Sequence, residues 1–224
     1  FAPFNHKFLL REFIFQVLCF IIVYGATVVG LKSQLFSSPF NLTVVIPAAL
    51  FVLIEAILYG QLSATFFSFM LSFGVFAASS WQIIPFLFTL ASCLASSAIV
   101  RKIERRIDMV LVAIILAFLD AVIISIIAVI FNENLRGMPV VIGGVAANGF
   151  LSGILALGLI TPIEFMLNTA SVFRLMDLSD LNNPIMRKML IAASGTYQHS
   201  QMVGQLAENA CREIGADPLI AKVG

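Results

Sequence analysis

The sequence predicts an all-α membrane protein, in which a bundle of six transmembrane helices is followed by a polar helical tail. Hydrophobic residues make up 60% of the 224 residues and charged residues only 11%, whereas a soluble domain carries about 25% charged residues. The mean hydropathy is +1.04. No segment alternates apolar and polar residues as a transmembrane strand would. Lipid rather than water must therefore surround most of the surface.

Six apolar segments are long enough to cross a bilayer, which takes about 20 residues. No water is available there to bond the backbone, so each segment must pair its own polar groups and form a helix. The predicted spans, in chain order, are 12–31, 41–59, 62–80, 82–100, 109–131 and 139–167.

Lysine and arginine residues predict the orientation, because cytoplasmic loops are enriched in them. Clusters precede the first span, separate the fourth and fifth spans, and follow the sixth span. With six spans, all three clusters fall on one side, so both ends of the chain are predicted to be cytoplasmic and the protein to lie in the cell membrane. The opposite loops, 32–40 and 132–138, hold one cation each. The clustered cations are Lys7, Arg11, Arg101, Lys102, Arg105, Arg106, Arg174, Arg187 and Lys188.

Four polar side chains fall inside the predicted spans: Glu55, Asp120, Asn148 and Glu164. An ionisable group at this depth costs several kcal/mol unless it faces the bundle interior, so each is a candidate functional residue. The alternative is that they join helices by hydrogen bonds, and Glu164 is close enough to the cytoplasmic end to reach the interface. A transporter would favour inverted repeats, and none relates residues 1–80 to 81–167.

Polar composition from about residue 168 predicts a connector and two helices. Asn183 and Pro184 suit the start of a helix over 184–193, and residues 194–196 should break it. A second helix is expected over 197–214, with Gly215 ending it. Its inner face is predicted from residues that recur at helical spacing: His199, Met202, Val203, Leu206, Ala210 and Ile214.

The tail resembles a known family. The stretches LMDLSDLNNPIMRKML (175–190), GTYQHSQMVGQLAE (195–208) and IGADPL (214–219) are similar to the seven-transmembrane HD-domain family, the PgpH-type cyclic di-AMP phosphodiesterases of bacteria. The spans fit more loosely, through NGFLSGILALG (148–158) and the arginine-rich loop. The tail match is specific, whereas the bundle alone would not be.

The resemblance implies a domain layout. Family members have an N-terminal span, a large extracellular domain, seven spans and a cytoplasmic all-α HD hydrolase domain. This chain begins with Phe1, so we expect a piece that holds the second to seventh bundle spans. The layout expected is a bundle over 1–167, a connector over 168–195 and the first helices of the HD domain over 196–224. Such a piece is expected to be inactive alone.

The resemblance also implies a metal site. In the family, the histidine of the Tyr-x-His-Ser run is the first ligand of a two-metal site, and here that position is His199. Two divalent metals generate a hydroxide and stabilise both oxygens of a phosphodiester displacement, and imidazole with carboxylate suits iron or manganese. The other ligands would follow Gly224. Without this context, a lone histidine on an apolar helix face is more often a core or capping residue.

The function implied is a membrane-anchored phosphodiesterase that converts cyclic di-AMP to a linear dinucleotide under the control of an external sensor. The alternative is a receptor or transporter-like bundle that binds a small ligand and carries a regulatory or inactive HD domain. A formal net charge of +1 gives no electrostatic case for nucleic acid as a partner. An external ligand is expected through the missing extracellular domain, and a homodimer stays open.

Overall fold

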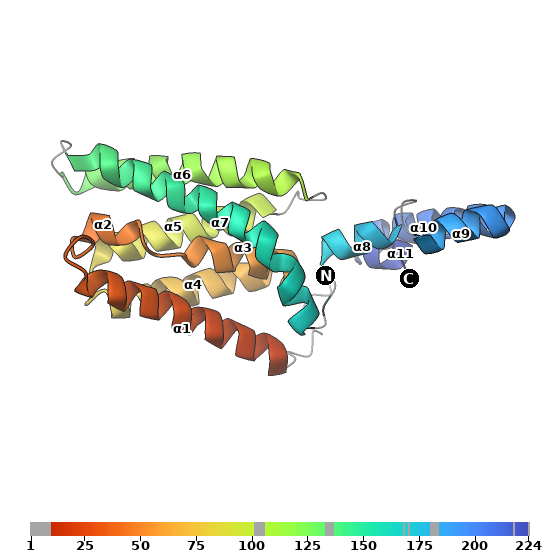
Figure 1. Ribbon diagram of the computed structural model, residues 1–224, viewed down its shortest axis with the longest axis horizontal. Helices are drawn as coiled ribbons and strands as arrows, with labels where there is room; N and C mark the ends of the chain where they lie inside the picture. The colour runs from red at the N-terminus through yellow and green to blue at the C-terminus, as the bar shows by residue number, and fades with distance from the viewer. Residues whose placement is uncertain are drawn as a thin grey trace. The chain divides into compact units, whose positions relative to one another are not determined.

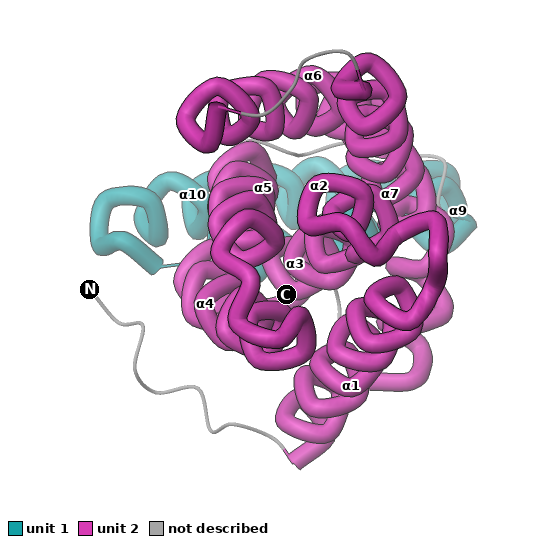
Figure 2. The backbone as a smooth tube through the Cα atoms, turned by 90° about the vertical axis from the view of Figure 1, so that its left-hand side faces the viewer, with its two compact units in different colours: residues 1–8, 169–224 teal, residues 9–168 magenta. Residues whose placement is uncertain are grey.

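The computed structural model describes residues 10–100, 106–132, 137–167, 169, 171–179, 184–216 and 218–223. These residues form helices and loops with no strand, which confirms the all-α prediction. The chain divides into two compact units, one built from the described residues up to 167 and the other from those after it (Figure 2).

The first unit is a helical bundle (Figure 1). Its helices are α1 (Leu10–Lys32), α2 (Pro39–Thr43), α3 (Ala48–Tyr59), α4 (Gln61–Ala78), α5 (Ile83–Ile99), α6 (Asp108–Ile130) and α7 (Met138–Leu167). With α2 and α3 taken together, five segments are long and apolar enough to cross a membrane. The predicted span over 82–100 is apolar but shorter, because α5 holds only 17 residues.

Helix α3 forms the centre of the bundle. Every residue from Ala48 to Ile57 is buried, and α3 packs against α4, α5 and α7; the end-on view shows it enclosed by its neighbours (Figure 2). A helix that is hydrophobic all round must be covered on all sides. Helices α1, α4, α6 and α7 keep apolar side chains on the surface, as helices that face lipid do.

The second predicted span is not continuous. We expected one helix over 41–59, but the helix stops at Thr43 and starts again at Ala48. Pro47 directly precedes α3, and proline cannot donate a backbone hydrogen bond and clashes with the preceding turn of a helix. The residue before it, Ile46, is also biased away from helical geometry. The apolar span predicted over 41–59 is therefore present, but it is interrupted at residues 44–47.

Helices α6 and α7 approach each other through small residues. A Cβ placed on Gly153 would lie 2.5 Å from Cβ of Ala113, and one on Gly149 would lie 3.2 Å from Cα of Ala117. Absence of side-chain atoms at these positions lets the backbones come together. The Gly149-x-x-x-Gly153 stripe therefore packs inside the bundle.

The described residues of the second unit form four helices: α8 (Val172–Ser179), α9 (Pro184–Ala192), α10 (Ser194–Ile214) and α11 (Pro218–Val223). Helix α9 begins at Pro184 as predicted, while its expected cap, Asn183, lies outside the described residues. The break is at Ala193 alone, with φ −146° and ψ 63°. We expected residues 194–196 to be non-helical and to separate the two helices. This was wrong, because α10 begins at Ser194. Gly215 ends α10 in the left-handed conformation, as predicted.

Replacing Gly153 by alanine is expected to destabilise the bundle by about 1–3 kcal/mol, the usual cost of overpacking. The new methyl group would meet Ala113 of α6, whose backbone cannot move aside cheaply. Gly158→Ala in the same helix is the matched control, since a Cβ there meets nothing within 4 Å. Unfolding of the detergent-solubilised protein measures both. Equal stability of the two variants would contradict the close α6–α7 contact.

Candidate functional site: buried polar groups and the His199 helix

Glu55 is fully buried in the last turns of the central helix α3. Its Oε1 accepts two hydrogen bonds of 2.6 Å, one from Nε2 of Gln16 on α1 and one from Oγ of Ser63 on α4. Its Oε2 is buried with no partner among the described residues. The carboxyl group thus joins three helices through one oxygen and leaves the other unused.

Asp120 lies midway along α6 and is 2% exposed. Ser92 of α5 lies close to its carboxyl group, and a Cβ on Gly149 of α7 would lie 2.7 Å from its Oδ2. Its Oδ1 has no partner in the described part of the chain. The glycine therefore makes room for this carboxyl group between α5, α6 and α7.

Asn148 holds the broken span together. Its Nδ2 reaches the carbonyl oxygens of Val44 at 2.9 Å, Ile46 at 3.0 Å and Thr43 at 3.5 Å. Its Oδ1 accepts a hydrogen bond of 3.3 Å from Oγ of Ser152. The carbonyls freed between α2 and α3 would otherwise lack these donors inside the bundle, where an unpaired backbone group is costly. This geometry gives Asn148 the joining role that the sequence left as the alternative to a functional one.

Glu164 is 4% exposed near the end of α7, two residues after Pro162. We expected it to be able to reach the interface, but its side chain is turned into the protein. The four predicted polar residues do not come together in one site. They occupy separate places in the bundle, and a functional role for each stays a prediction.

His199 lies on the outer surface of α10, exposed and without a hydrogen bond or ion pair to any described residue. The apolar residues that follow it at helical spacing are exposed too; Met202 is 65% exposed. We call this surface, formed by His199, Met202, Val203, Leu206, Ala210 and Ile214, the α10 stripe. It was predicted to face inward, but the described residues leave it uncovered.

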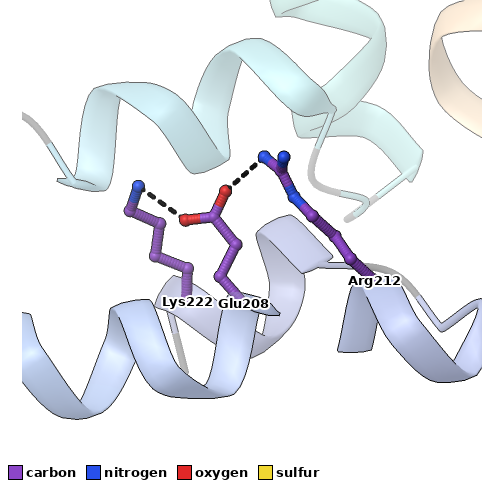
Figure 3. A network of polar contacts seen from close by, with 3 residues as sticks. All are labelled: Glu208, Arg212 and Lys222. Atoms are coloured by element: carbon purple, nitrogen blue, oxygen red, sulfur yellow. Dashed lines mark hydrogen bonds and ion pairs between the residues drawn. The ribbon is translucent and has the colours of Figure 1, made fainter. Parts of the chain in front are cut away.

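The opposite side of α10 packs instead, against α9 and α11. A Cβ on Gly204 would lie 3.1 Å from the backbone oxygen of Lys222. Glu208 is held between Nζ of Lys222 at 2.9 Å and Nη2 of Arg212 at 2.6 Å (Figure 3). The hydrogen bond from Lys222, and then that from Arg212, hold the pKa of Glu208 below its ordinary value.

No group of three or more His, Cys, Asp or Glu side chains that could hold a metal ion occurs in the parts of the chain that the structure describes. His199 is accessible to a metal, and its imidazole suits iron or manganese. By itself it provides a single ligand. Its assignment as a metal ligand stays a prediction.

Comparison with known proteins gives the family. The family described as 7TM receptor with intracellular HD hydrolase matches residues 2–171. The chain belongs to this family. It is therefore a multi-pass membrane protein, and the HD hydrolase of the family implies dependence on divalent metal ions. No solved structure matches the chain.

Two curated relatives of this 7TM HD protein carry the same name. The cyclic-di-AMP phosphodiesterase PgpH of Bacillus subtilis (strain 168) is 36% identical over 126 residues, which cover 55% of this chain and 18% of the relative. That of Listeria monocytogenes serotype 1/2a (strain 10403S) is 31% identical over 192 residues, 82% of this chain and 26% of the relative. The chain thus spans about a quarter or less of the length of these relatives.

Sequence reasoning missed the partners of Glu55. Glu12, Gln16 and Cys19 stand four and three residues apart on α1, which places them on one side of that helix, and Glu12 and Cys19 are buried. Glu12 is the first residue of the predicted span over 12–31, and its charge gave no reason to place it inside the protein. Its helical spacing with Gln16 was the signal that this side of α1 faces the protein.

Asn148→Ala should destabilise the bundle by about 1–3 kcal/mol, because three buried carbonyls lose their shared donor. Asn41→Ala is a matched control, since the Asn41 amide donates a single bond to the exposed carbonyl of Leu35. Unfolding in detergent reports the difference. Asn148→Ala with wild-type stability would show that water or lipid headgroups replace the amide.

Acid should release α11 from α10. A carboxyl group whose pKa is lowered in the folded state contributes stability above its unfolded pKa, about 4.3, and loses it as pH falls through the folded pKa. Protection of α11 amides from hydrogen exchange should therefore hold above about pH 5 and fall below about pH 4. Glu208→Gln should remove this pH dependence; if it persists in the variant, another group controls α11.

Proposed function

We propose that this chain is the membrane bundle and the entrance helix of a metal-dependent cyclic-dinucleotide phosphodiesterase, which converts cyclic di-AMP to a linear dinucleotide on the cytoplasmic side. Family membership supports the assignment, as do relatives named for this activity. The observation that carries it for this chain is the accessible His199 at the start of the α10 stripe.

The α10 stripe is suited to become part of the hydrophobic core of a hydrolase domain once further helices cover it. One side of α10 is closed by α9 and α11, while the stripe presents several large apolar side chains. Burying them stabilises a domain by roughly 1.5–3 kcal/mol per large side chain. We assign residues 196–224 to the first part of the HD domain, and the rest of that domain would pack on this stripe.

His199 would supply one imidazole ligand to the metal pair, with iron and manganese the best matches for imidazole and carboxylate ligands. When bound, two such metals supply a hydroxide and stabilise the oxygens of the displaced phosphodiester. The role of this chain is to hold the imidazole at a fixed place. The 21-residue α10 provides a rigid support, ended sharply by Gly215.

Both ends of the chain are proposed to be cytoplasmic, with the bundle over 1–167 in the cell membrane. The basic clusters support this orientation, although Lys7, Arg136 and residues 101–105 lie outside the described residues. Trp81 fits the outer interface, since it is 72% exposed at the turn between α4 and α5. Indole rings favour that layer.

Residues 168–195 are proposed to pass a signal from an external sensor to the hydrolase. Short helices α8 and α9 occupy most of this connector, and a partly helical link transmits rotation that a flexible link would absorb. An external ligand and a homodimer would belong to the same proposal.

A second candidate function rests on the break between α2 and α3. Broken helices beside buried polar groups line ligand sites in many transporters, and the bundle combines the break at 44–47 with the buried carboxyl groups of Glu55 and Asp120. A receptor bundle with an inactive HD domain would use these features. Cyclic di-AMP hydrolysis by the full-length protein decides between the candidates.

His199→Ala in the full-length protein should abolish metal-dependent hydrolysis of cyclic di-AMP and lower the bound metal content. The exposed position of His199 means that its loss leaves the packing of α10 intact. Gln198→Ala, also exposed on α10, is the matched control. Normal hydrolysis and metal content in His199→Ala would show that the ligand assignment is wrong.

Cysteine labelling should confirm the orientation. In a cysteine-free background, a cysteine at Lys102 should react with a membrane-impermeant reagent only after the cells are opened. A cysteine at Arg136 should react in intact cells. The reverse pattern would invert the topology and place His199 outside.

A further inference from the structure

Helix α9 presents basic and aliphatic side chains together on its exposed side. Ile185 is 72% exposed and Ile191 is 77% exposed, and Arg187 and Lys188 between them are exposed as well. Ile191 follows Arg187 by four residues and Lys188 by three, and Ile185 precedes Lys188 by three. Residues at these spacings lie on one side of a helix. We call the surface formed by these four side chains the α9 face.

The opposite side of α9 is used within the protein. Met186 and Met189 are half-buried, and α9 packs against α10. Neither Arg187 nor Lys188 forms an ion pair or a hydrogen bond with a described residue. The described part of the chain therefore leaves the two cations of the α9 face to a partner outside it.

The charge of the α9 face indicates the kind of partner. Helix α9 carries Arg187, Lys188 and no acidic residue, whereas α10 carries two glutamates and one arginine. An apolar surface such as the α10 stripe suits a protein core. Aliphatic side chains interleaved with cations suit an anionic lipid surface instead, because the aliphatic groups enter the boundary of the acyl chains while the cations meet the headgroups.

The place of α9 in the chain favours the membrane over an acidic partner that diffuses in water. Helix α7 ends at Leu167 and α9 begins at Pro184. Even if every residue of this link outside α8 were fully extended, the link would reach no more than about 40 Å. The lipid surface beside the bundle therefore stays close to α9, at a high effective concentration.

We propose that the α9 face binds the headgroup layer of an anionic bilayer. Arg187 and Lys188 would contact lipid phosphates, and Ile185 and Ile191 would lie at the boundary of the acyl chains. The long basic side chains can keep their charged ends at the headgroups while their methylene groups cover apolar surface. Helix α9 would then lie on the membrane that holds the bundle. This binding is independent of cyclic di-AMP hydrolysis, so its test measures lipid contact only.

The test places the full-length protein in nanodiscs, whose two leaflets hold the same lipid, so the result does not depend on orientation. In a cysteine-free background, Ala192→Cys at the exposed end of α9 carries a nitrobenzoxadiazole dye. An equal small share of neutral lipid with a nitroxide near its headgroup quenches the dye when α9 lies on the bilayer. Quenching should be strong in phosphatidylglycerol discs and weak in phosphatidylcholine discs. It should fall in about 1 M salt, where the Debye length is about 3 Å.

Substitutions on the α9 face should separate its charge from its apolar contact. Lys188→Gln should lower the ratio of bound to free α9 roughly fivefold in anionic discs, and Arg187→Gln added to it should lower the ratio roughly 30-fold. Ile185→Asn with Ile191→Asn should weaken binding while both charges stay. Arg174→Gln on α8 is the matched control, because it removes one exposed cation outside the α9 face and should change the ratio little. Arg187→Lys keeps the charge and should bind like wild type, which shows that losses in the glutamine variants do not come from misfolding.

Three results would overturn the proposal. Equal quenching in the two kinds of disc would mean that anionic headgroups are not recognised. Absence of quenching in both would mean that another part of the protein covers the α9 face or that it stays in water. A loss in Arg174→Gln as large as that in Lys188→Gln would reduce the effect to net charge.

Discussion

The structure depends on satisfying the backbone polar groups that a broken helix leaves unpaired inside the bundle. The break between α2 and α3 frees carbonyl groups in the most buried segment of the bundle, and three of them converge on the amide of Asn148. Helix α7 thereby fixes the place where α3 starts. Because α3 is buried and packs against α4, α5 and α7, this anchor lies at the start of the helix at the centre of the bundle.

The close approach of α6 and α7 is the second constraint. Gly149 lets α7 approach Ala117 and also leaves space for the Asp120 carboxyl group. A larger residue at position 149 would collide with both the Ala117 backbone and this carboxyl group. Small residues at this contact therefore position a polar group in addition to packing two backbones.

The sequence was sufficient to predict the helical class, the approximate spans and the end of α10 at Gly215, because these follow from local composition and glycine chemistry. It did not locate the break at 44–47, because apolar residues lie on both sides of Pro47. The hydrogen bonds that join Glu55 to Gln16 and Ser63 were also missed, since these residues come from three helices and only the packing brings them together. The α10 stripe was correctly recognised as one surface, but whether it is covered depends on what packs against it. A single exposed histidine cannot identify a metal site by geometry, so family resemblance carried that prediction.

The short length of α5 has a consequence for the surrounding lipid. At 1.5 Å per residue, its 17 residues extend about 25 Å, whereas the hydrocarbon core of a typical bilayer is about 30 Å thick. Such hydrophobic mismatch is relieved when the bilayer thins locally, at a modest free-energy cost per ångström. Trp81, on the turn that leads into α5, would draw the headgroup layer inward at this edge.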